Sequence, residues 1–78
     1  MDNYELIAKI KHEAGTKLLS IASALRNVDT ALKNSGNEKI WVSEKHGVTA
    51  SDSLTAAMNT LDQLHEIFKK YERLTDEG

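Results

Sequence analysis

The chain has 78 residues, room for one small domain, and its composition limits how that domain can be stabilised. It contains no cysteine, which excludes disulfide bonds and thiolate metal sites and is typical of a reducing cytosol. A formal net charge of −2 gives no overall attraction to nucleic acid or to an anionic membrane. No apolar run is long enough for a signal peptide or a membrane span. We therefore expect a cytoplasmic protein that binds neither DNA nor membrane.

The first half of the chain is predicted to form one long helix over about residues 3–34. Its apolar residues follow one another at steps of three or four for more than three heptads. Gly36, in the polar segment 34–37, is expected to end the helix. Gly15 lies inside it and costs about 1 kcal/mol relative to alanine, which indicates close approach of another backbone or of a ligand. The predicted stripe is Ile7, Ile10, Ala14, Leu18, Ile21, Leu25, Val28 and Leu32.

A second helix is predicted over about residues 49–75. Thr49 and Asp52 have capping-box spacing, and Ser51 is an alternative N-cap. The predicted apolar stripe is Leu54, Met58, Leu61, Leu64, Phe68 and Tyr71, widened by Ala57 and Ile67.

The connector between the helices holds the only tryptophan, Trp41, between Ile40 and Val42. Connectors are usually polar, so a large aromatic residue there is either buried or part of a binding surface. Between two helices of similar length, Trp41 is best interpreted as a buried plug at the bend, without direct ligand contact.

These elements predict an all-α fold: an antiparallel two-helix hairpin that makes up a single domain over 1–78. A helix pair hides only one side of each helix, and the apolar residues extend beyond one seam. We therefore expect a homo-oligomer. The alternative is a bent monomer whose open end is closed by Trp41.

The sequence offers little catalytic chemistry. His12-Glu13 and His65-Glu66 begin like the zinc-protease motif, but neither has a second histidine four residues after the first. A nucleophile-elbow sequence and a phosphate-binding glycine loop are both absent. We predict a binding protein, not an enzyme, with no metal and no cofactor.

Four residues are candidates for ligand binding. Tyr4 and Lys11 are seven apart and share a helix face, where a ring can stack on a base and an ammonium can meet a phosphate. They equally fit packing on a neighbouring subunit and a solvated charge. Ser51 and Thr55 lie at the start of the second helix, where free N–H groups favour anions. Ser51 equally fits a capping role, whereas Thr55 is not needed for capping.

Three short motifs carry a family resemblance. The first helix reads Ile10-Lys11-His12-Glu13-Ala14-Gly15, the connector Trp41-Val42-Ser43, and the second helix Ser51-Asp52-Ser53-Leu54-Thr55-Ala56-Ala57-Met58. With these motifs the chain resembles the phage anti-CBASS cyclic-nucleotide sponges and the helical hairpin that they share with phage anti-Thoeris sponges. About four residues within 45–50 are extra relative to the family pattern.

The resemblance implies a compact homo-oligomer, typically a hexamer, that captures cyclic di- or trinucleotides in the host-cell cytoplasm without cleaving them. It implies that Lys11 meets a ligand phosphate and that Tyr4 stacks on a base. It also implies that Ser51 and Thr55 approach the pocket from a neighbouring chain.

A second class of function stays open, a helical protein–protein interaction module with no small ligand. Its members would include secreted hairpins, secretion helpers and phage inhibitors of a host protein. Secreted Trp-x-Gly hairpins also place tryptophan at the bend, but this chain has Trp41-Val42-Ser43 there. A DNA-binding module is disfavoured by the acidic balance and the lack of a basic stripe.

Overall fold

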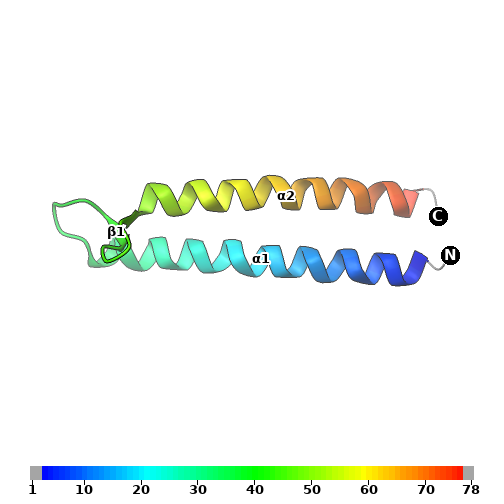
Figure 1. Ribbon diagram of the computed structural model, residues 1–78, viewed down its shortest axis with the longest axis horizontal. Coiled ribbons are helices and arrows are strands. Elements are labelled where there is room, and N and C mark those ends of the chain that lie inside the picture. Colours follow the sequence, from blue (N-terminus) through cyan, green and yellow to red (C-terminus); the bar gives the residue numbers. More distant parts are fainter. Residues whose placement is uncertain (1–2, 77–78) are drawn as a thin grey trace.

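The computed structural model describes residues 3–76, which form two long antiparallel helices side by side (Figure 1). Helix α1 spans Asn3–Asn34 and helix α2 spans Ala50–Asp76, so the predicted hairpin and its bounds are confirmed to within one residue. The molecule measures 56 × 19 × 15 Å, and its radius of gyration is 16.9 Å. A compact domain of this length would have a radius of gyration of about 11.5 Å. The chain is therefore a rod that is one helix thick.

The bend is not a plain loop but a small β-hairpin. Strand β1, Trp41–Ser43, pairs antiparallel with strand β2, Val48–Thr49, through a β-turn over residues 44–47. Gly47 closes the turn with a φ of 67°, and its N–H donates to the Glu44 carbonyl at 3.1 Å. Glycine adopts this left-handed conformation without the steric cost of a Cβ. Residues 45–50 therefore contain most of the turn, strand β2 and the first residue of α2.

Both helix ends at the bend are held by side chains. The Asp52 N–H donates to Thr49 Oγ1 and the Thr49 N–H to Asp52 Oδ2, each at 3.1 Å, which confirms the capping box with Thr49 as N-cap. Helix α1 ends differently from the prediction. The Ser35 hydroxyl donates to the Leu32 carbonyl at 2.9 Å, and Gly36 has no positive φ. A serine, not an αL glycine, therefore satisfies the last turn of α1.

The contact between the helices, here called the seam, keeps part of each predicted stripe and replaces the rest by neighbouring residues. Its α1 side includes Lys17, Ala24 and Ala31, and each of them directly precedes a leucine of the predicted stripe. Leu18, Leu25 and Leu32 are instead 50%, 50% and 57% exposed. The seam consists of Ile7, Ile10, Ala14, Lys17, Ile21, Ala24, Val28 and Ala31 of α1 with Ala50, Ser53, Ala57, Thr60, Leu64, Ile67, Tyr71 and Leu74 of α2.

The core of one chain is small. Only Ile10, Ala14, Ala57 and Leu64 are buried among the described residues, and none of these side chains is completely enclosed. The seam is rich in alanine, which lets the helices approach closely but buries little apolar area per residue. Within residues 3–76, neither helix combines the length and the apolar character needed to cross a membrane.

The capping box gives a direct test of the bend. Thr49→Ala removes the oxygen that accepts the Asp52 N–H, so we expect the free energy of unfolding to fall by about 1 kcal/mol. Urea denaturation followed by circular dichroism measures the change. The matched control is Ser51→Ala, because Ser51 is exposed and its side chain is not part of the box. An equal loss in the control would show that Thr49 is not the N-cap.

Candidate functional site

The four candidate ligand-binding residues lie in two separate groups in one chain. Tyr4 and Lys11 are on α1 near the open end of the hairpin, and Ser51 and Thr55 are on α2 next to the bend (Figure 1). Ser51 is level with about residue 30 of α1, so it is about 30 Å along the rod from Lys11 at ~1.5 Å per residue. One chain therefore does not bring the two groups together.

The group at the open end includes an aromatic residue that sequence reasoning had assigned only to the α2 apolar stripe. The Lys11 ammonium lies 6.0 Å from the centroid of the Tyr71 ring, within the range of a cation–π contact. Tyr71 is half-buried in the seam, whereas Tyr4 is exposed on α1 one heptad before Lys11. Lys11 thus contacts Tyr71 across the seam, and Tyr4 lies about 10 Å further toward the open end on α1. Tyr71 joins this group only because the helices pair antiparallel.

The group at the bend is already engaged in helix capping and local hydrogen bonds. Asp52 places a carboxylate at the first turn of α2 and uses it to accept the Thr49 N–H. The Thr55 hydroxyl donates to the Ser51 carbonyl at 3.0 Å. Thr55 can therefore offer a ligand only its acceptor lone pairs, while Ser51 keeps an exposed hydroxyl.

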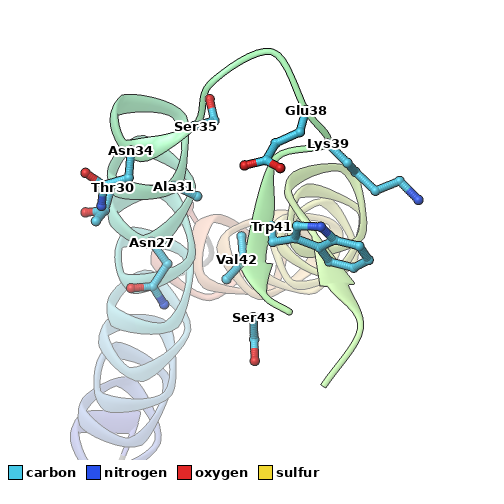
Figure 2. A pocket seen from close by; sticks show the side chains of 10 residues that line it. All are labelled: Asn27, Thr30, Ala31, Asn34, Ser35, Glu38, Lys39, Trp41, Val42 and Ser43. Carbon is cyan, nitrogen blue, oxygen red and sulfur yellow. The ribbon is translucent and has the colours of Figure 1, made fainter. Parts of the chain in front are cut away.

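A pocket of about 530 Å³ lies between the end of α1 and β1, open to solvent. Figure 2 shows the Val42 side chain directed toward α1 and the Trp41 ring directed away from it, with Lys39 alongside. The Lys39 ammonium is 5.1 Å from the centroid of the Trp41 ring. The lining is Asn27, Thr30, Ala31, Asn34, Ser35, Glu38, Lys39, Trp41, Val42 and Ser43.

Trp41 departs from its predicted role as a buried plug. It is half-buried, it belongs to strand β1, and it forms part of the wall of the bend pocket. Successive side chains of a strand point to opposite faces, so Val42 and not Trp41 fills the space next to α1. The two-residue and three-residue strands are too short to leave a periodic signal, which is why the sequence did not reveal this arrangement.

A second, apolar groove of about 430 Å³ runs along α2. Leu61, Leu64, His65 and Phe68 line it with Asp62. Within residues 3–76, no three histidine, aspartate or glutamate side chains come together to hold a metal ion.

Comparison with known proteins gave no match for this chain to a protein-family model, a curated protein or a solved structure. The resemblance to the sponges therefore rests on the three short sequence motifs alone.

The pair of Lys39 and Trp41 can be tested by fluorescence, because the chain has no other tryptophan. We expect Lys39→Ala to uncover one face of the ring and to raise the acrylamide quenching constant of Trp41. Lys33→Ala is the control, since the Lys33 ammonium pairs with Asp29 at 3.0 Å and does not contact the ring. Equal quenching in the Lys39 variant and the wild type would contradict the contact.

Proposed function

We propose that this chain is a non-catalytic binding protein that captures cyclic di- or trinucleotides. In this proposal it is phage-encoded, acts in the host-cell cytoplasm, and withholds the nucleotide signal from an antiviral effector. The observation that carries the proposal is the cluster at the open end, where Lys11 lies 6.0 Å from the Tyr71 ring and one heptad from Tyr4. Aromatic rings stack on any base, and a lysine ammonium binds phosphate as a compact point charge.

The proposed site needs more than one chain. Ser51 and Thr55 lie roughly 20–30 Å from Lys11 along the rod at ~1.5 Å per residue, so one chain does not combine the four residues in one site. In the proposal a neighbouring copy in a homo-oligomer supplies Ser51 and Thr55. The sponges that the chain resembles are typically hexamers. Exposed leucines on both helices support self-association.

Calorimetry with a panel of cyclic di- and trinucleotides tests the function. We expect binding of at least one member, with the nucleotide recovered intact from the mixture by chromatography. Lys11→Ala should weaken that binding by roughly 10- to 100-fold, because it removes a charge-assisted contact worth about 1.5–3 kcal/mol.

The matched control is Lys9→Ala, because Lys9 is also exposed on α1 but is two positions around the helix from Lys11. It should bind as the wild type does. Absence of heat with every nucleotide at high micromolar concentration would overturn the proposed function. Normal binding by the Lys11 variant would overturn only the role given to Lys11.

A second candidate function is favoured by the large apolar side chains that one chain leaves exposed. It is a protein–protein interaction module without a small ligand, such as a secreted hairpin, a secretion helper or an inhibitor of a host protein. A chain that binds no nucleotide of the panel but forms an equimolar complex with one host protein belongs to this class.

A further inference from the structure

Apart from Tyr4, Leu6 and Leu19, the large apolar residues outside the seam lie on one side of the hairpin. In α1 each of Leu18, Leu25 and Leu32 directly follows a seam residue, and the same offset holds for the apolar residues of α2. One residue is a rotation of about 100° around a helix. Because the helices are antiparallel, this rotation turns both sets to the same side. We call it the apolar side: Leu18, Ala22, Leu25, Leu32, Leu54, Met58, Leu61 and Phe68.

The opposite side of the hairpin is polar. Its residues directly precede the seam residues, and nearly all of them carry charges, hydroxyls or amides. A layer 15 Å thick with one apolar side requires a second layer on that side only. The polar side consists of Leu6, Lys9, Glu13, Thr16, Ser20, Ser23, Asn27 and Thr30 of α1 with Asp52, Ala56, Asn59, Gln63, Glu66, Lys70 and Arg73 of α2, and Leu6 and Ala56 are its two apolar members.

We propose that the apolar side binds the apolar side of a second copy, with the two bends at opposite ends, to form an antiparallel four-helix bundle. Each α1 then lies along the partner's α1, and the two-fold axis passes between Leu18 and Ala22. In this register the residues of the α1 contact pair large with small and positive with negative.

Size and charge both match in the α1 contact. Leu18 meets the partner's Ala22, and Leu25 meets the partner's Gly15. In one hairpin a Cβ built on Gly15 would meet nothing within 4 Å, so the space above Gly15 is open to that leucine. Lys11 meets the partner's Asp29, an opposite charge. This contact also explains a mid-helix glycine that the packing within one chain does not require.

The apolar residues of α2 are consistent with the same position of the two-fold axis. Lys17 contacts Gln63 and Lys11 contacts Tyr71, so facing residues of the two helices have numbers that add to about 81. The axis at residue 20 of α1 therefore crosses α2 at Leu61, the middle of the α2 apolar row. Leu61 then meets its own copy, and Leu54 meets the partner's Phe68.

The apolar groove on α2 fits this register. Leu61, Leu64, His65 and Phe68 are at positions i, i+3, i+4 and i+7, the four corners of a hole in knobs-into-holes packing. The residue of the second copy that falls on the centre of this hole is Met58, which is 64% exposed in one chain. A flexible thioether next to Phe68 suits such a hole.

The proposed bundle also brings together the two groups of candidate ligand-binding residues. This part of the inference rests on the proposed function. Lys11 of one chain reaches the level of the partner's Asp29, which lies beside the first turn of the partner's α2. The Tyr4 and Lys11 group of one chain and the Ser51 and Thr55 group of the other therefore lie at the same end of the bundle. The two groups that are separated in one chain are brought together by the second copy.

Native mass spectrometry and light scattering test the interface. The wild type should have an even multiple of the 8.7 kDa chain mass. Leu61→Glu places two carboxylates against each other at the axis and should raise the dimer dissociation constant by about 100-fold or more. Leu19→Glu is the matched control, because Leu19 is 71% exposed on α1 away from the apolar side, and it should keep the wild-type mass.

Circular dichroism shows whether each variant keeps its helices, since Leu61 is outside the seam. A specific interface should have a dissociation constant of about micromolar or lower, so the wild type should be dimeric at 100 micromolar. A monomeric wild type at that concentration would overturn the proposal. A helical Leu61→Glu variant with the wild-type mass would also overturn it.

Charge reversal tests the register. Lys11→Glu and Asp29→Lys should each weaken the dimer by about tenfold, because each places like charges together, and the double variant should recover most of the affinity. Failure of the double variant to recover would overturn the antiparallel register. Calorimetry keeps the two proposals apart. A dimer that binds no nucleotide overturns the function alone, and a monomer that binds one overturns the interface alone.

Discussion

Two helices that lie side by side have only one seam, and in this chain nearly half of the seam residues are small. Alanine, serine and threonine at positions such as Ala24, Ser53 and Ala57 allow the helices to approach closely. A buried leucine or phenylalanine contributes about 1.5–3 kcal/mol, far more than an alanine. Here most leucines and the only phenylalanine stay largely outside the seam. Much of the hydrophobic stabilisation available to the sequence is therefore not realised within one chain.

The hydrogen bonds of the bend fix how the two helices are aligned, which the small residues of the seam do not. The Ala50 N–H donates to the Ile40 carbonyl at 3.0 Å, which ties the start of α2 to the residue before β1. Together with the Thr49–Asp52 box, this fixes where α2 begins relative to α1. At the other end the helices are linked across the seam by longer side chains, such as Lys11 over the Tyr71 ring. The register of the hairpin is thus set mainly at the bend and extends from there along the rod.

The sequence predicted the features that depend on local chemistry. The capping pair and the helix bounds follow from residues within a few positions of each other, and they agree with the structure. The seam was harder to predict, because each helix carries two adjacent apolar stripes with the same period. Periodicity favoured the stripe with Leu18 and Leu25, whereas the close contact uses Lys17 and Ala24. The contact between Lys11 and Tyr71 depends on how two distant segments pair, which no local pattern contains.

The two uses proposed for Lys11, self-association and phosphate binding, are compatible in charge. Asp29 already pairs with Lys33 at 3.0 Å on the same helix. In the proposed bundle Lys11 joins this pair from the second copy, so two ammonium groups surround one carboxylate. The cluster carries one excess positive charge and accepts a phosphate without losing the Asp29 contact. A ligand that neutralises this charge stabilises the bundle, and by thermodynamic linkage the bundle strengthens ligand binding to the same extent. In an isolated chain Lys11 is roughly 27 Å along α1 from the Asp29–Lys33 pair at ~1.5 Å per residue, so in the proposed bundle assembly is the step that brings the three charges together.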